Sequence, residues 1–228
     1  MSLLQQMQMA QAGGGVGDPY WADVVALLHF DVDYTDVTGK IWTSASGSPP
    51  PGQITAAQSK FGGKSINFNG TGGWSITTPN SADLAFPGDF TIEGWVWQDP
   101  AYTSTYRTLF IGDSMGCISV SIKDGKISAG ANSVADDVTG ATTIPTSAWN
   151  HIAITRSGSS LKVFLNGNVD GAVTNTRNYT QGSATFRIGA SASGTAFGGY
   201  VDDLRVTKGV ARYTANFIPP TAPFPNHA

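Results

Sequence analysis

From residue 24 onward, short apolar or alternating runs recur along the chain, with turn-forming residues between them. Short runs of this kind, separated by Gly, Asn, Asp and Ser, are typical of the strands of a sandwich or barrel. We therefore predict an all-β fold, with strands over residues 25–30, 65–68, 74–78, 90–98, 108–111, 117–123, 126–131, 151–156, 161–165, 185–188 and 200–206.

The residues between these runs predict that successive strands pair antiparallel. Asp124-Gly125 and Asn166-Gly167 suit the positive φ angles of tight hairpin turns, and residues 157–160 join two further runs. Residues 45–58 differ, because they are rich in Ser and Gly and include three consecutive prolines. Proline lacks the amide donor that a central strand needs, so we expect this stretch to be an exposed loop.

The run over residues 90–98 has apolar side chains on both faces. Its alternation places Phe90, Ile92 and Val96 on one face and Glu93, Trp95 and Trp97 on the other. We expect one face to lie in the core of a two-sheet sandwich and the other to be partly covered by loops.

Composition supports a globular all-β chain. Charged residues make up 13% of the sequence and hydrophobic residues 40%, an apolar fraction that excludes a disordered chain. The net charge of −3 comes from 13 basic and 16 acidic residues without long runs. No basic stripe is available to neutralise a series of phosphates, so we expect no nucleic-acid partner. Glu93 is the single glutamate, and the other acids are aspartates, which favour turns over helices.

We predict three segments, namely an N-terminal arm and hinge over residues 1–23, one domain over 24–222 and a tail over 223–228. Leu3, Leu4 and Met7 fall on one helical face of the arm, which ends at a Gly-rich stretch. A helix of about twelve residues is marginal alone. Two interpretations therefore stay open, a frayed terminus and a flexible or helical anchoring arm that orders on a partner.

The start of the chain lacks the charged and apolar regions of a secretory signal. The apolar run over residues 24–28 is far shorter than the roughly 18 residues that suggest a transmembrane helix. We expect no membrane insertion and synthesis in a cytoplasm.

Six motifs occur in an order that points to a known family. They are LHFD (28–31) with DVTGK (36–40), KFGGKSINFNG (60–70), GDFTIEGWV (88–96), WNHIAITRSG (149–158) with VFLNG (163–167), RIG (187–189) and YVDDLRVTKGVARY (200–213). Together they resemble the laminin-G-like (concanavalin A-like lectin/glucanase) domain family over roughly residues 24–222.

This resemblance implies a jelly-roll sandwich of two antiparallel sheets, with the last long strand beside the first. The closing motif with Pro219-Pro220 is similar to versions of the domain in virion proteins of tailed bacteriophages and prophages. It implies a capsid decoration, head-fibre or tail protein, made in the bacterial cytoplasm and located in the virion. Such a protein would be a homo-oligomer or present in multiple copies, and would bind other virion proteins through Leu3, Leu4 and Met7.

Catalytic motifs are missing. A glycosidase needs two carboxyl groups across the scissile bond, but Glu93 has only Trp95 and Trp97 beside it on its strand face. Cys117 lies in a strand-like run, where it is expected to act as a small hydrophobe. We therefore expect no enzyme, with a glycan-active hydrolase as the alternative.

Two roles are open for the aspartates near the ends of the domain. Many related jelly rolls hold calcium, and the topology that the resemblance implies brings Asp31 towards Asp202 or Asp203. Calcium needs six to eight oxygens, which carbonyls and water would complete. In the alternative role these side chains cap turns and pair with Arg205 or Lys208, and no cofactor is required.

Glycan binding needs an exposed aromatic ring beside hydrogen-bonding groups, because sugar C–H faces pack on rings while hydroxyls seek polar partners. Candidates in expected loops are Tyr102, Tyr106, Asn175, Asn178 and Tyr179. We predict a non-enzymatic virion component whose jelly roll binds host-surface carbohydrate. A free carbohydrate-binding lectin module is a further alternative.

Overall fold

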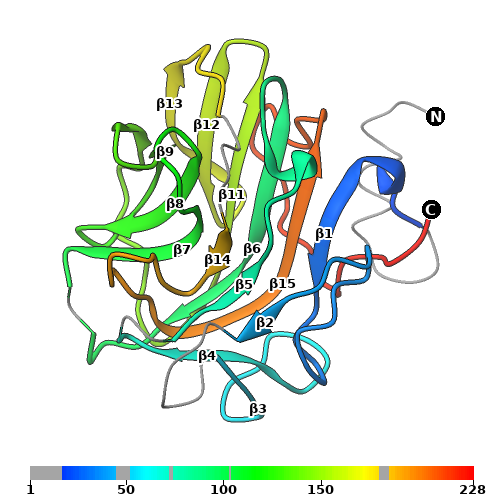
Figure 1. Ribbon diagram of the computed structural model, residues 1–228, viewed down its shortest axis with the longest axis vertical. Helices are drawn as coiled ribbons and strands as arrows, with labels where there is room; N and C mark the ends of the chain where they lie inside the picture. The colour runs from blue at the N-terminus through cyan, green and yellow to red at the C-terminus, as the bar shows by residue number, and fades with distance from the viewer. Residues whose placement is uncertain (1–16, 45–51, 72–73, 103, 180–184) are drawn as a thin grey trace.

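The computed structural model describes residues 17–44, 52–71, 74–102, 104–179 and 185–228. The arm residues Leu3, Leu4 and Met7 lie outside these ranges. Two antiparallel sheets pack face to face (Figure 1), which confirms the predicted all-β jelly-roll sandwich. The only helical elements in the described ranges are two short 3-10 turns, η1 (Trp21–Asp23) and η2 (Ala82–Leu84).

Fifteen strands lie within the described residues. The eight-stranded sheet contains β1 (Val24–Leu28), β3 (Gln53–Thr55), β4 (Ser65–Asn69), β6 (Phe90–Gln98), β11 (Trp149–Ser157), β12 (Ser160–Leu165), β13 (Asn168–Thr174) and β15 (Gly198–Lys208). The seven-stranded sheet contains β2 (Thr43–Ser44), β5 (Ile76–Thr78), β7 (Tyr106–Gly112), β8 (Ile118–Lys123), β9 (Lys126–Ala131), β10 (Ala135–Thr139) and β14 (Phe186–Ile188).

β15 organises the eight-stranded sheet. It pairs with β6 on one side, while on the other side its first residues pair with β4 and its last residues with β1. The last strand therefore lies beside the first, as the family resemblance implies (Figure 1). The partner changes at Asp202 and Asp203, where the register with β6 also shifts, and Asp203 has a φ of 51°.

The predicted hairpins are present. Asp124-Gly125 joins β8 to β9 and Asn166-Gly167 joins β12 to β13, with φ angles of 49° and 78° in the first turn and 50° and 79° in the second. β2, β3, β10 and β13 are not predicted by the sequence pattern. β10 and β13 are mostly exposed edge strands, so they lack the apolar alternation of a half-buried strand.

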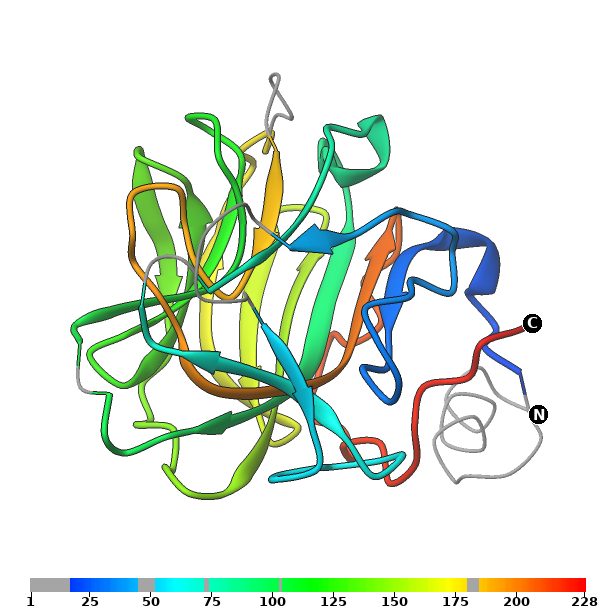
Figure 2. The same ribbon diagram turned by 60° about the horizontal axis from the view of Figure 1, so that its bottom comes forward.

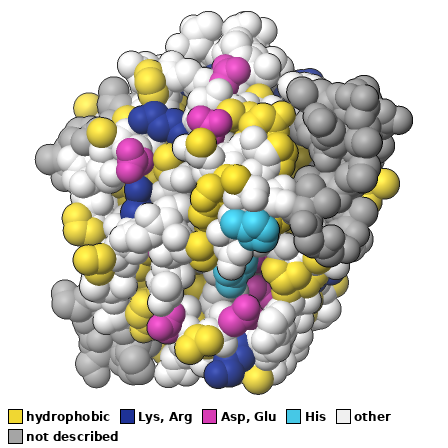
Figure 3. Space-filling view, turned by 90° about the vertical axis from the view of Figure 1, so that its right-hand side faces the viewer, with side chains coloured by type: hydrophobic (Ala, Val, Ile, Leu, Met, Phe, Trp, Pro, Cys, Tyr) yellow, Lys and Arg dark blue, Asp and Glu magenta, His cyan; other side chains and the backbone are white. Residues whose placement is uncertain are grey.

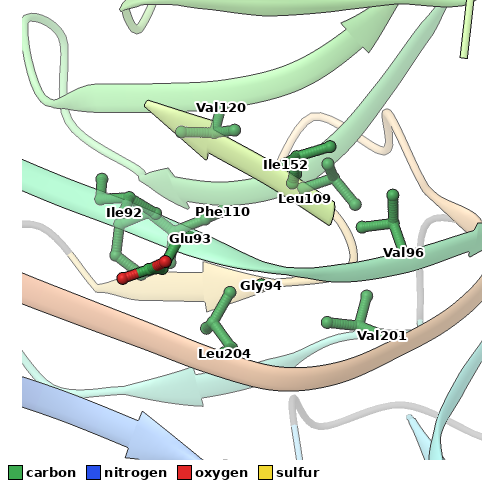
Figure 4. Close-up of a pocket in the computed structure, with 10 residues that line it drawn as sticks. All are labelled: Ile92, Glu93, Gly94, Val96, Leu109, Phe110, Val120, Ile152, Val201 and Leu204. Carbon is green, nitrogen blue, oxygen red and sulfur yellow. The ribbon is translucent and has the colours of Figure 1, made fainter. Parts of the chain in front are cut away.

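The core fills the space between the sheets. Phe90, Ile92 and Val96 of β6 point into it, as predicted from their alternation. A cavity of about 10 Å³ remains there, between Gly94, Leu204 and the side chains around them (Figure 4). It is about the size of a single water, so this cavity has no room for a ligand.

The chain ends cover the outer face of the eight-stranded sheet. Tyr213 and Phe217 pack on Phe164, and Phe224 packs on Leu27. Asp18 N donates to the carbonyl oxygen of His227 at 2.7 Å, and the two ends of the described chain lie close together (Figure 2). Residues 17–23, from the predicted arm and hinge, and residues 223–228, the predicted tail, pack against the domain.

No helix of the described ranges is long and apolar enough to cross a membrane.

Candidate functional site

A groove of about 290 Å³ lies on the outer face of the seven-stranded sheet. β7, β8, the β9–β10 connection and the loop over residues 191–195 line it. The alternation of β8 explains why this face is polar. Ile118, Val120 and Ile122 point into the core, so Ser119 and Ser121 between them point into the groove.

Four hydroxyl groups form a hydrogen-bonded chain along one wall of the groove. Thr108 Oγ1 lies 2.8 Å from Thr195 Oγ1, and Ser191 Oγ lies 2.6 Å from Thr195 Oγ1 and 2.9 Å from Ser193 Oγ. The loop holds its shape because Ser191 N donates to the carbonyl oxygen of Thr195 at 2.9 Å. Each hydroxyl can donate or accept, so the wall can adapt to either kind of ligand group.

Tyr106 stands at one end of the groove and is held there by two charged residues. Its Oη donates to Asp136 Oδ2, which also accepts a hydrogen bond from Lys123 Nζ at 2.8 Å. Lys123 Nζ lies 5.2 Å from the centroid of the Tyr106 ring. The hydrogen bonds to Asp136 and Tyr106 raise the pKa of Lys123 to about 12. The half-buried ring of Tyr106 therefore has a fixed orientation beside the hydroxyl wall.

Of the five residues predicted to bind glycan, only Tyr106 lines this groove. The Tyr102 ring packs against the backbone, so closely that a Cβ on Gly198 would lie 2.2 Å from Tyr102 Cδ2. Tyr179 is fully buried and donates to Asp137 Oδ2 at 2.9 Å. Its ring is therefore not the exposed surface that was expected.

Asn175 and Asn178 follow β13, in the other sheet. Asn178 is exposed, while Asn175 Oδ1 accepts a hydrogen bond from Arg177 N at 2.9 Å. Neither asparagine lines the groove with Tyr106. Sequence reasoning missed the serines and threonines of the groove, although the alternation of β8 marks Ser119 and Ser121.

A second cluster of polar side chains lies where β15 changes partner. Asp203 Oδ1 lies 2.5 Å from His29 Nδ1, and Asp203 Oδ2 accepts a hydrogen bond from Phe224 N at 2.7 Å. Asp202 Oδ2 accepts hydrogen bonds from Lys60 N at 2.7 Å and from Phe61 N at 3.1 Å. Figure 3 shows histidine and acidic side chains gathered on the face beside the chain ends.

The cluster shifts the titration of its members. Burial raises the pKa of Asp202 to about 7, and the charges of Asp203 and Asp31 act in the same direction, against the backbone hydrogen bonds. Burial lowers the pKa of His29, but the hydrogen bond and charge of Asp203 outweigh it, so this pKa is raised. The structure therefore brings Asp31, Asp202 and Asp203 into one neighbourhood, as expected.

The aspartates fit a calcium ion only in part. Asp31 Oδ1 and Asp202 Oδ1 are buried without a hydrogen-bond partner in the protein, whereas both oxygens of Asp203 are engaged. Within the described ranges, no three His, Cys, Asp or Glu side chains are arranged to hold a metal. Asp202 caps the turn at residues 60 and 61, as in the alternative role. Asp203 pairs with His29 in place of the expected pairing with Arg205 or Lys208.

Arg205 belongs instead to a buried network around Glu93. Arg205 Nη2 donates to Glu93 Oε1 at 2.8 Å and Arg205 Nη1 to Asp18 Oδ2 at 2.8 Å. Arg212 also pairs with Asp18, and Tyr213 Oη donates to Glu93 Oε2 at 2.8 Å. Burial alone would raise the pKa of Glu93, but the charge of Arg205 and the interaction with His151 hold this pKa well below its usual range.

Comparisons with known proteins agree with this architecture. Residues 68–212 match the family model of the concanavalin A-like lectin/glucanases superfamily. No curated protein sequence matches the chain. Domain 4 of AbnA, a GH43 extracellular arabinanase from Geobacillus stearothermophilus solved in complex with arabinotriose, is similar with 25% identity and a TM-score of 0.65. The match covers 83% of this chain and 94% of that domain.

Two toxin domains share the fold at lower identity. The binding domain of Paraclostridial Mosquitocidal Protein 1 has 17% identity and a TM-score of 0.64 over 85% of this chain. The receptor binding domain of botulinum neurotoxin D has 12% identity and a TM-score of 0.60 over 85% of this chain. The match spans 51% of each toxin chain. With its family model and its two-sheet sandwich, the chain belongs to the concanavalin A-like lectin/glucanase superfamily.

Proposed function

We propose that this protein binds carbohydrate through the groove on the outer face of the seven-stranded sheet. The observation that carries the proposal is the hydroxyl chain from Thr108 through Thr195 and Ser191 to Ser193, which ends in a groove that also holds the Tyr106 ring. Sugar hydroxyls need partners that donate and accept, and sugar C–H faces pack on aromatic rings. The groove supplies both on one wall of fixed geometry.

The size of the groove and the likeness to a sugar-bound domain support the proposal. A volume of about 290 Å³ lies at the lower end of ligand pockets, which suits a short stretch of a glycan. Domain 4 of AbnA, with the same fold at 25% identity, was solved in complex with arabinotriose.

We also propose that binding is not followed by hydrolysis. Glycosidases place two carboxyl groups across the scissile bond, and among the described lining residues of the groove Asp136 is the one carboxylate. Lys123 and Tyr106 both bond to Asp136. Glu93 extends from the opposite sheet, where Arg205 and Tyr213 occupy its two oxygens. These positions support a binding module over a glycan-active hydrolase.

The finer proposal is that the module is displayed on a bacteriophage particle. Its support is the likeness of the closing motif around Pro219-Pro220 to virion proteins and the placement of the chain ends. The described chain begins at Gly17, beside His227, on the side of the molecule that lies away from β7 and β8 (Figure 1). Attachment through the arm would leave the groove facing outward. Many displayed copies would then raise weak glycan binding through avidity.

The test is a glycan array probed with the multimerised domain, using Tyr106→Ala and the matched variant Tyr200→Ala. Tyr200 is also half-buried, but it lies in the eight-stranded sheet against Trp97. We expect wild type and Tyr200→Ala to bind the same glycans and Tyr106→Ala to lose them. Silence of the wild type across bacterial polysaccharides would contradict carbohydrate binding.

The virion and enzyme proposals need separate measurements. Mass spectrometry of purified particles should detect the protein, and its absence there would favour a free lectin module. Incubation with each bound glycan should release no new reducing ends. Their appearance would favour the hydrolase.

A further inference from the structure

We propose that the groove selects uncharged glycans and rejects those that carry carboxylate groups. This inference rests on the proposed function and names the class of ligand for the same site. Its starting point is the charge of the lining. Among the described lining residues, Asp136 is the one ionised side chain, and the other polar groups are hydroxyls and the amide of Asn132.

The lysine nearest to the groove is already engaged. Lys123 Nζ donates to Asp136 Oδ2 at 2.8 Å and stands over the ring of Tyr106. A sugar carboxylate at this end of the groove would either lie against Asp136 or take Lys123 away from it. The first arrangement places like charges together, and the second leaves Asp136 without its cation, although the Tyr106 hydroxyl still donates to it. Both are unfavourable.

No cationic side chain lines the groove within the described residues. Arg107 alternates with Tyr106 along β7 and is buried, with its Nη1 donating to the carbonyl oxygen of Tyr102 at 3.1 Å. Arg187 Nε pairs with Asp113 Oδ2 at 2.6 Å. Lys126 faces Lys123 across the β8–β9 pair but is not a lining residue of the groove. A carboxylate inside the groove therefore meets no free cation among the lining residues.

Hydroxyl groups suit an uncharged ligand better. The chain through Thr195 and Ser191 can reverse its direction of donation to match a sugar hydroxyl. It carries no charge to offset the desolvation of a carboxylate. The groove is therefore matched to the hydroxyl-rich, neutral face of a sugar.

The experiment uses the multimerised full chain and pairs of glycans that differ only in charge. Polygalacturonate oligomers are compared with their methyl esters, and alginate oligomers with their carboxyl-reduced products, beside neutral arabinan, galactan and mannan oligomers. We expect the wild type to bind at least one neutral glycan and to bind neutral members at least about tenfold more tightly than acidic partners.

Substitutions at the Lys123–Asp136 ion pair should change the ratio of neutral to acidic glycan affinity in opposite directions. Asp136→Asn releases Lys123 and should reduce the discrimination several-fold. Lys123→Met leaves Asp136 without its cation and should increase it. Asp124→Asn is the matched control, because Asp124 is exposed in the β8–β9 turn and does not line the groove. Circular dichroism and melting temperature establish that each variant is folded.

The outcomes separate the inference from the proposed function. Acidic glycans that bind as tightly as their neutral partners, and lose binding in Tyr106→Ala, would overturn the selectivity and leave carbohydrate binding intact. An unchanged ratio in folded Asp136→Asn and Lys123→Met would also overturn it. If no glycan of either kind binds, the proposed function fails, and the inference fails with it.

Discussion

Arg205 donates two hydrogen bonds to Glu93, from Nε at 3.0 Å and from Nη2 at 2.8 Å, and both reach the same Oε1 atom. Tyr213 completes the carboxylate by donating to Oε2 at 2.8 Å. β6, β15 and the C-terminal segment that carries Tyr213 are thereby joined at one buried group. The single glutamate of the chain serves the fold, on the sheet opposite to the groove.

Removing this carboxylate should be costly. Glu93→Ala leaves Arg205 and Arg212 buried with Asp18 as their one remaining carboxylate, and breaking a buried ion pair costs about 3–5 kcal/mol. Urea unfolding measures the loss. Asp83→Asn is the control, because the Asp83 side chain is 52% exposed in its pair with Lys40 and an exposed pair contributes about 0–1 kcal/mol. Equal losses in the two variants would contradict a structural role for Glu93.

The contribution of Glu93 should depend on pH. Its pKa is held below the value of 4.5 of an unperturbed glutamate, despite burial, chiefly by Arg205. A carboxyl group of this kind stabilises the fold above its unfolded pKa, and the contribution is lost as the pH falls below about 4.5. The stability gap between wild type and Glu93→Gln should therefore narrow between pH 6 and pH 3. A constant gap would show that charge is unimportant there.

Ionisation of Asp202 should change the stability of the fold in the direction opposite to that of Glu93. Burial raises its pKa to about 7, from 3.8 in an unperturbed aspartate, so its ionisation destabilises the fold as the pH rises from about 4 to about 7. A pKa difference of one corresponds to about 1.4 kcal/mol. In Asp202→Asn the amide oxygen can still accept from Lys60 N and Phe61 N. The unfolding free energy of this variant, relative to that of wild type, should therefore rise by about 1 kcal/mol or more between pH 5 and pH 8.

The neighbouring residue provides a control for this measurement. Both oxygens of Asp203 have partners, His29 and Phe224 N, so Asp203→Asn should lose stability at pH 7. Gains in both variants, or in neither, would contradict the unequal roles of the two aspartates.

Chelation should leave the protein unchanged. Because both oxygens of Asp203 are engaged within the chain, we expect EDTA to leave the melting temperature where it is. The contrary result is a melting temperature of wild type that falls in EDTA and recovers when calcium is added, with no such recovery in Asp202→Asn. It would establish the structural calcium ion that the family resemblance raises as an alternative.

The hydroxyl wall predicts a separation of binding from stability. Thr195→Val keeps the shape of the side chain and removes the oxygen that both Thr108 and Ser191 contact. We expect the unfolding free energy to change by about 1 kcal/mol and glycan binding on the array to fall about tenfold, since two hydroxyls lose a shared partner. Thr174→Val, on the exposed edge strand β13, should change neither. Full binding by Thr195→Val would place the ligand elsewhere.

Much of the fold follows from the sequence, because buried strands have a visible period. The bounds of β6 and β9 agree with the predicted ranges, and the positive φ angles at Asn166 and Gly167 agree with the predicted hairpin. β10 is harder to predict from the sequence, because its residues Ala135–Thr139 are mostly exposed and polar. Such a strand is defined by its partner β9, which the local pattern does not reveal.

The groove is less visible in the sequence than the sheets. Tyr106 is found by its chemistry and Ser119 by the alternation of β8, but Ser191 and Thr195 come from a loop about 70 residues further along the chain. The contact of Thr195 with Thr108 depends on β14 pairing with β7. Tyr179 illustrates the opposite error, since the turn residues around it suggest exposure while its ring packs on Phe90.

Location of the ligand can be tested by nuclear magnetic resonance, with backbone amide shifts followed while the labelled protein is titrated with the neutral oligosaccharide that binds best on the array. We predict that the shifts concentrate in residues 119–121, 131–136 and 191–195, which surround the groove. Shifts confined to residues 58–63 and 202–203, or to residues 175–179, would contradict binding at the seven-stranded sheet.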